Sequence, residues 1–385
     1  MMKVDLSKYE FTGHNSPEVE DLTRLDNNEK KSMRMAGFDA NEQNRSASFV
    51  QIDHNHAFCK SYDPGVEILP IGLAMKIHEG LADYQWKLLK PGKDEFTRMA
   101  SDNPHGGYVI RVKKGARLNN PIQSCLMMHA EDVGQNVHNI IIIEEGAEAH
   151  ILSGCTTSQA DQSAAHIGIS EYYIEKNARL TFTMVHNWGE HVEVRPRSAG
   201  EVDAGGVFLS NYISLKPVKN LQMYPSVAMK GAGSVSRFNS IIVATEGSFM
   251  DVGNKVILDA PETRTEIISH AIASGGHIIA RGHIQANCAP SKGHLECQGL
   301  LLKNGIIQAI PELDGRAEGV ELSHEAAVGK LAKEELEYLM IRGLDEQAAG
   351  SAIIRGFLNI DIMGLPSELQ SEIDKAIAET EKSMF

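Results

Sequence analysis

The sequence predicts a mainly β protein built around a parallel β-helix. Turn residues recur about every 30 residues through the middle of the chain, and short runs rich in Val, Ile and Leu replace helical patterns there. Only 6% of the residues are aromatic, which suits narrow coils filled by small and aliphatic side chains. A fixed spacing is typical of solenoids, in which each coil packs on its neighbours. A two-sheet sandwich, which also needs frequent turns, is the alternative.

Residues 1–105 are predicted to form an α+β region. Residues 16–18 (Ser-Pro-Glu) are typical of a capped helix start. Asp26 and Glu29 have capping-box spacing before a short helix that Gly37 would end. The remaining expected elements are a strand at 48–52 and an amphipathic stretch over 73–89.

Residues 106–322 are predicted to form the β-helix. Residues 108–112 and 140–143 are β-rich runs of the kind that forms strands. Gly or Asn is expected at each corner, because these residues tolerate the left-handed backbone that others resist. The predicted corner residues are Gly115, Gly146, Asn177, Gly206, Gly233, Gly247, Gly276 and Gly305.

Residues 323–385 are predicted to form a small helical domain. A first amphipathic helix is expected to begin at Gly329 and to end at Gly343. Residues 348–357 are expected to form a second helix, and a third is expected to begin at Pro366. So small a bundle is expected to lean on a larger structure.

Composition excludes several classes of function. The formal charge of −14 argues against nucleic acid and anionic membranes as partners. The chain starts without an apolar leader and has no apolar run long enough to span a membrane, which predicts a cytoplasmic protein with reduced thiols. It has no P-loop, dinucleotide fingerprint or serine nucleophile elbow, so no common enzyme motif is present.

Potential metal ligands concentrate in one segment. Thiolates and imidazoles are ligands for zinc, copper and iron–sulfur clusters. Strand alternation would put Cys297 on the face of Leu295 and Leu301, so an ordinary core cysteine is an equal alternative. The cluster comprises His283, Cys288, His294, Glu296 and Cys297.

Two further features could carry chemistry. Cys155 and His186 lie 31 residues apart, so in a solenoid of this pitch they could stack on adjacent coils. A neighbouring imidazole can favour the reactive thiolate, although a buried cysteine beside a satisfied histidine is the alternative. His324 and Glu325 lie where the β pattern is expected to stop, either as a functional pair or as a polar junction.

The chain resembles the SufB/SufD family, the scaffold components of the SUF iron–sulfur cluster assembly machinery. The resemblance is clearest from Cys155 onward and is loose over the first hundred residues. Its landmarks, in order, are Gly154-Cys155-Thr156, Val185-His186-Asn187-Trp188, Arg281-Gly282, Cys297, Pro311-Glu312, His324-Glu325-Ala326, Tyr338-Leu339, Arg342-Gly343-Leu344 and Gly356-Phe357.

The resemblance implies a right-handed parallel β-helix and a role for particular residues. Cys155 would accept sulfur, and His186 and Trp188 would lie on an internal route. Cys297 would hold the nascent cluster at a scaffold interface, together with the His324–Glu325 pair. Two positions differ from the SufB-type pattern: Ser323 replaces a usual carboxylate and His186 a usual glutamine, so Cys288 is a further candidate ligand.

The sequence therefore predicts a non-enzymatic scaffold that holds a transient iron–sulfur cluster. The resemblance implies a SufC-like ABC ATPase and a sulfur donor as partners, with a second copy of the chain or a SufD-like paralogue completing the scaffold. It leaves the cluster type and a flavin as electron source open. The alternatives are a structural partner that only recruits the ATPase and a β-helix enzyme acting on carbohydrate.

Overall fold

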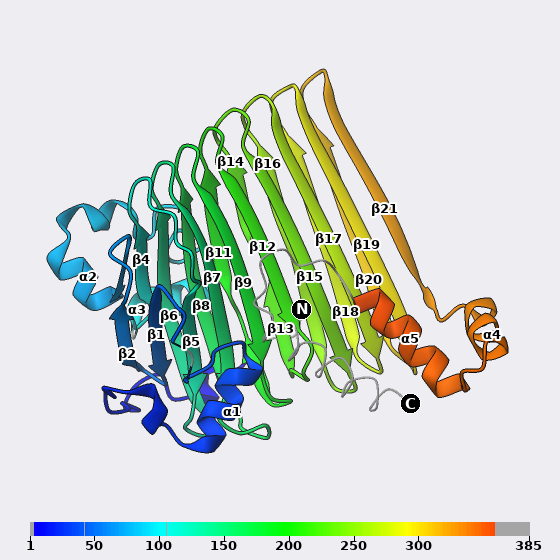
Figure 1. Cartoon of the computed structure of the whole chain (residues 1–385), viewed down its shortest axis with the longest axis horizontal. Helices are drawn as coiled ribbons and strands as arrows, with labels where there is room; N and C mark the ends of the chain where they lie inside the picture. The colour runs from blue at the N-terminus through cyan, green and yellow to red at the C-terminus, as the bar shows by residue number, and fades with distance from the viewer. Residues whose placement is uncertain (1–3, 42, 105, 359–385) are drawn as a thin grey trace.

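The structure, a computed structural model, describes residues 4–41, 43–104 and 106–358 and confirms the predicted parallel β-helix (Figure 1). Two long sheets face each other and the chain passes between them at each coil. The first sheet contains, in spatial order, β2 (Asn55–Ser61), β1 (Ala47–Ile52), β5 (Ile122–Met128), β7 (Glu148–Thr157), β9 (Arg179–Asn187), β12 (Val207–Ser214), β15 (Val235–Thr245), β17 (Thr263–Ser274), β19 (Ser291–Leu302) and β21 (Val320–Lys330).

The second sheet lies opposite the first. Its strands are β3 (Val66–Pro70), β4 (Tyr108–Val112), β6 (Val133–Ile143), β8 (Ala164–Ile174), β10 (Val192–Val194), β11 (Arg197–Val202), β13 (Asn220–Met223), β14 (Ser226–Met229), β16 (Phe249–Leu258), β18 (His277–Ala286) and β20 (Ile306–Gly315). Inward-facing aliphatic and aromatic side chains from both sheets form one continuous core along the solenoid.

Helices lie at both ends of the solenoid (Figure 1). The α-helices are α1 (Asn27–Met35), α2 (Ile71–Ile77), α3 (Glu95–Asp102), α4 (Lys333–Ile341) and α5 (Glu346–Leu358), and the 3₁₀ helices are Leu6–Lys8, Leu22–Arg24 and Glu79–Asp83. Among the described residues, no helix is long and apolar enough to cross a membrane.

The predicted corners are largely confirmed. Gly115, Gly146 and Asn177 have φ between 56° and 71°, the left-handed backbone expected at a corner. In three coils the left-handed residue is a near neighbour of the predicted one: Gly205, Gly275 and Lys303. The predicted glycines of these coils do not have a left-handed backbone, but a side chain at these positions would clash with its neighbours. A Cβ on Gly276 would lie 2.4 Å from Thr245 O, and one on Gly305 2.0 Å from Ala273 O.

The N-terminal strands continue both sheets. β1 pairs in parallel with β5, β2 runs antiparallel to β1, and β3 runs antiparallel to β4. The chain therefore covers the first coil with antiparallel strands, which end each sheet without exposing a parallel edge.

The predicted helices of this region have mixed outcomes. The capping box of Asp26 and Glu29 is present at the start of α1, and Gly37 follows its end with φ 83°. The prediction that a helix starts at residues 16–18 is wrong. This segment is held extended because Ser16 N donates to Asn55 Oδ1 and Val19 N donates to Ala57 O. In the amphipathic stretch 73–89, α2 already ends at Ile77.

A buried carboxylate fixes residues 86–89 to the second sheet. Glu171 in β8 accepts hydrogen bonds from Trp86 N at 2.7 Å, Leu88 N at 2.6 Å and His138 Nε2 at 2.8 Å. Burial raises the pKa of Glu171, but the hydrogen bonds from His138 and from the Leu88 and Trp86 backbone outweigh it and hold the pKa below its usual value.

The change from strand to helix comes later than predicted. Gly329 belongs to β21, and the first C-terminal helix starts at Lys333, because the segment pairs with β19 over its length. Gly343 ends α4 with φ 101°, and α5 spans the predicted second helix. α5 packs on the first sheet through Ile354 and Leu358. The third helix, predicted from Pro366, lies outside the described residues.

Candidate functional site

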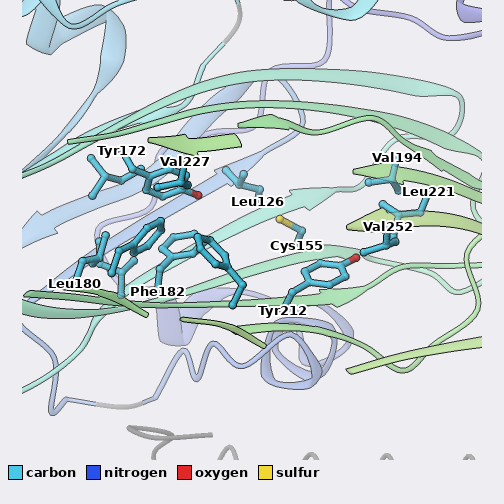
Figure 2. Close-up of a cluster of buried hydrophobic side chains, with 14 of the residues drawn as sticks. Leu126, Cys155, Tyr172, Leu180, Phe182, Val194, Tyr212, Leu221, Val227 and Val252 are labelled. Carbon is cyan, nitrogen blue, oxygen red and sulfur yellow. The ribbon is translucent and has the colours of Figure 1, made fainter. Parts of the chain in front are cut away.

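Cys155 and His186 are cross-strand neighbours. In the parallel pairing of β7 with β9, Cys155 lies directly opposite His186, which confirms that the two residues stack on adjacent coils. The Cys155 side chain points into the β-helix between Leu126 and Tyr212 and is 1% exposed (Figure 2). Its Sγ lies 3.7 Å from Met184 Sδ.

These side chains line an enclosed cavity inside the β-helix. The cavity has a volume of about 60 Å³, and its lining includes Cys155, His166, Met184, His186 and Tyr212. At 10–15 Å³ per water centre, the space would hold about four water molecules. The cavity could therefore admit a small species such as a sulfur atom carried on a cysteine.

Electrostatics favour the neutral forms of both residues. Burial, with a smaller effect of Cys125, raises the pKa of Cys155 well above its ordinary value. Burial and the neighbouring His166 lower the pKa of His186, whose Nδ1 lies 2.8 Å from Tyr212 Oη. The interior of the β-helix thus holds a neutral thiol beside an imidazole that is bonded to Tyr212, which is the second of the two alternatives that the sequence leaves open.

His166 is a part of this site that the sequence analysis missed. Its Nδ1 bonds to Gln135 Oε1 at 3.0 Å, and burial lowers its pKa to about 3. Its ring lies 5.2 Å from Trp188, whose other neighbour is His186 at 5.3 Å. The 31-residue spacing of the coils could have identified it, because His166 pairs with Gln135, 31 residues earlier, just as His186 pairs with Cys155.

Trp188 follows β9 and is buried between the two imidazoles. It is 4% exposed, and its indole Nε1 is buried without a hydrogen-bond partner among the described residues. An indole N–H can only donate, so an acceptor reaching this point would satisfy it.

Cys297 lies inward on β19, one strand from the C-terminal end of the first sheet. Its neighbours are Ser269 on β17 and Ala326 on β21. It shares the inward face with Leu295, as strand alternation predicted, and is 3% exposed. Burial, followed by the nearby charge of Glu296, raises its pKa to about 11.

His324 and Glu325 both lie on strand β21 and are exposed. His324 pairs with Leu295 and therefore shares the inward face of Cys297, whereas Glu325 pairs with Glu296 on the outer face. The sequence predicts these residues at the start of the helices. They lie within the last strand instead.

Cys288 lies far from Cys297 in one copy. It is half-buried in the turn before β19, and its Sγ contacts Ala289 O at 3.8 Å. The strand from Ser291 to Cys297 alone spans about 20 Å. Among the described residues no three His, Cys, Asp or Glu side chains could hold one metal ion. A single copy therefore does not gather the four predicted ligands Cys288, Cys297, His324 and Glu325.

The two remaining cysteines have structural surroundings. Cys125 faces outward from β5 into the core under α1, and burial raises its pKa to about 12. Cys59 in β2 contacts Ile68 O at 3.3 Å, and burial raises its pKa likewise.

Cys155 on β7 and Cys297 on β19 both face the inside of the solenoid. Five strand steps separate β7 from β19, which at about 4.8 Å each amounts to about 24 Å. The register partners of Cys297 on the intervening strands are Ser269, Ser240, Tyr212 and Met184, and on β7 this row ends at Ser153, two residues before Cys155. Hydroxyl groups thus follow the inner wall between the two thiols.

Burial predicts an order of thiol reactivity. In the native protein at pH 8, iodoacetamide is expected to modify Cys288 first, Cys297 more slowly and Cys155 last, because the thiolate is the reactive form and burial opposes it. Raising the pH toward 11 should accelerate Cys297, whose pKa is about 11, before Cys155. Peptide mass spectrometry over time measures the order. Early modification of Cys155 would contradict the closed site.

Comparison with known proteins gives one consistent result. A family model described as "SUF system FeS cluster assembly, SufBD core domain" matches residues 126–357. An iron–sulfur cluster assembly SufBD family protein of Archaeoglobus fulgidus is 46% identical, covering 93% of this chain and 96% of that protein. A SufBD family protein of Methanothermobacter thermautotrophicus is 40% identical over 99% of this chain and 95% of its own length.

A more distant relative carries a more specific name. The iron–sulfur cluster assembly protein SufB of Bacillus subtilis is 30% identical, covering 79% of this chain and 66% of that protein. The matched region runs from β5 to α5 and includes Cys155, His186, Trp188 and Cys297. This chain belongs to the SufB/SufD family of the SUF system for iron–sulfur cluster assembly.

Proposed function

We propose that the chain is a scaffold that accepts sulfur at Cys155 and builds a nascent iron–sulfur cluster at Cys297. The observation that carries this proposal is that the thiols of Cys155 and Cys297 face the same interior, on strands five steps apart in one sheet. Cys297 is close to the exposed end of the solenoid, where a cluster could form and leave. Thiolates are the usual protein ligands of iron–sulfur clusters.

A second copy would complete the site. Among the residues that the structure describes, β20 pairs only with β18 and β21 only with β19, so both sheets end there at open edges. Leu313 and Val328 on these strands are 40% and 42% exposed. Open edges of this kind favour pairing with another chain, and a twofold axis would bring two sets of ligands together. The incomplete ligand set of one copy supports a homodimer or a pair with a SufD-like paralogue.

The helical end would bind an ABC-type ATPase, as the SUF system implies. Within the described part of the chain, α4 has no buried residue, and the exposed apolar side chains on and after it are Tyr338, Met340, Ile341 and Leu344. Movement of the two ATPases on a dimer would open its interface and expose Cys297.

Ile341 offers a direct test of this docking. It is 86% exposed, so Ile341→Asp should leave folding unchanged and abolish co-purification with the ATPase, because a carboxylate would be buried in an apolar interface. Size-exclusion chromatography of the co-expressed pair measures binding, with Glu334→Lys on the same helix as the control. Unchanged binding by Ile341→Asp would contradict docking at α4.

Cluster transfer distinguishes the scaffold from the alternative, a partner that only recruits the ATPase. The chain is loaded anaerobically with ferrous iron and sulfide, passed through a desalting column and mixed with an apo-ferredoxin. Circular dichroism should show a ferredoxin cluster forming from the protein fraction. If iron and sulfide separate from the chain on the column while ATPase binding persists, the recruiting role is correct and the scaffold role is not.

A further inference from the structure

A polar groove opens beside the strand ends that carry Cys155 and His186. It lies between α1 and the turns that follow β7, β9 and β12, and its volume is about 790 Å³. This volume falls within the range of about 300–1,000 Å³ that is usual for ligand pockets. We call it the α1 groove; its lining includes Asn28, Ser32, Gln159, Asn187, Trp188 and Lys216.

The floor of the α1 groove is continuous with the Cys155 site. Thr157, which lines the groove, follows Cys155 by two residues, a distance of about 7 Å along a strand. Asn187 directly follows His186. Trp188 lines the groove, and its ring contacts His186, which lines the inner cavity with Cys155. Trp188 therefore lies between the groove and the inner cavity.

Helix α1 is a fixed wall of the groove. Its capping box stabilises the start, and Ser32 Oγ donates to Ser158 O at 3.4 Å across the groove base. At the other end, Ala36 O packs directly on β7, where a Cβ on Gly154 would lie 2.4 Å from it. Glycine beside Cys155 thus allows α1 to approach the strand that carries the thiol.

The lining suits a peptide segment better than a free anion. Asn28, Ser32 and Gln159 offer amide and hydroxyl groups of the kind that bind peptide backbone. Charges of both signs border the space, because its lining also includes Lys31 and Glu190. A hydrosulfide ion is about the size of a water molecule, whose share of liquid volume is about 30 Å³, and would fill little of the groove.

We propose that the α1 groove binds the persulfide-bearing loop of a protein sulfur donor; this inference rests on the proposed role of Cys155 as sulfur acceptor. Trp188 lines the groove and touches His186, so the arriving loop would pack against its indole ring beside the Cys155 site. In the transfer, the Cys155 sulfur bonds to the terminal sulfur of the donor persulfide and the sulfur–sulfur bond of the donor breaks. The donor leaves as a thiol with the proton of Cys155, with no net oxidation.

Filling the groove tests this proposal. The full-length protein is incubated with a cysteine desulfurase charged from sulfur-35 cysteine, and the label on Cys155 is measured after non-reducing electrophoresis and peptide mapping. Asn28→Trp on α1 and Ala160→Trp on the opposite turn should each lower the labelling rate about ten-fold, the equivalent of about 1.4 kcal/mol of docking. Asn27→Trp, on the adjacent exposed position of α1 that does not line the groove, should label as the parent does.

A second experiment distinguishes docking of a donor protein from entry of a free ion. Cluster formation from ferrous iron and free sodium sulfide should be equal in the parent and in both groove variants. If the groove variants also form less cluster from free sulfide, the groove admits a free ion and the docking proposal is wrong. If they take label from the desulfurase as fast as the parent, the groove does not dock the donor, while Cys155 stays the acceptor. If Cys155→Ser takes as much label as the parent, the acceptor role fails and the groove proposal fails with it.

Discussion

Cys155→Ser is expected to lower the uptake of persulfide sulfur from a charged cysteine desulfurase by at least about ten-fold, because a serine hydroxyl cannot form the sulfur–sulfur bond that a thiol forms. The substitution is nearly isosteric, and Met184 Sδ at 3.7 Å is the one hydrogen-bond partner recorded for the Cys155 thiol among the described residues. Uptake is measured by mass spectrometry of the unreduced protein after desalting.

The same variant should still assemble a cluster from free iron and sulfide. Cys155 and Cys297 lie about 24 Å apart, five strand steps along the solenoid, so loss of the acceptor leaves the cluster site intact. Cys125→Ala is the matched control, because Cys125 lies one strand away but faces the core under α1. Normal persulfide uptake by Cys155→Ser would contradict its assignment as acceptor.

Glu171→Ala is expected to destabilise the fold by about 3–5 kcal/mol, because each buried donor left without its acceptor costs about 1–3 kcal/mol. The change removes the acceptor for the backbone N–H groups of Trp86, Leu88 and Leu89. His138 Nε2 and Tyr173 Oη lose the same acceptor, and both of these residues are buried. Segment 86–89 should then detach from the second sheet. Urea unfolding followed by circular dichroism measures the loss, and Glu148→Ala at an exposed position of β7 should change stability by less than about 0.5 kcal/mol.

The pH dependence of this effect has a definite sign. The folded-state pKa of Glu171 is depressed, so its contribution is fully present above the ordinary glutamate pKa of about 4.3 and is lost as the pH falls through the lower folded value. The stability difference between the parent and Glu171→Ala should therefore be constant near neutral pH and shrink below about pH 4. A difference that grows as the pH falls would contradict the stabilising role of the carboxylate.

Sequence pitch predicts the thiol–imidazole pair because parallel coils stack in register. Once residues 31 apart occupy neighbouring strands, the pairing of Cys155 with His186 follows without knowledge of any side-chain contact. Strand alternation likewise predicts the inward face of Cys297. These predictions depend only on period and parity, which local sequence contains.

The end of the solenoid and the groove depend on tertiary contacts instead. Residues 326–329 (Ala-Ala-Val-Gly) have no clear strand or helix period, and pairing with β19 decides that they extend the sheet. This pairing puts His324 and Glu325 on opposite faces of a strand. The α1 groove combines a helix from the N-terminal region with three turns of the β-helix, a proximity that no local pattern contains.

Mössbauer spectroscopy of the anaerobically reconstituted protein measures whether Cys297 holds a nascent cluster. The parent chain, loaded with iron-57 and sulfide, should show the quadrupole doublets of a sulfur-ligated cluster. Cys297→Ser should lose most of that signal, whereas Cys59→Ser, at a structural position in β2, should retain it. Equal cluster iron in the parent and in Cys297→Ser would contradict the account.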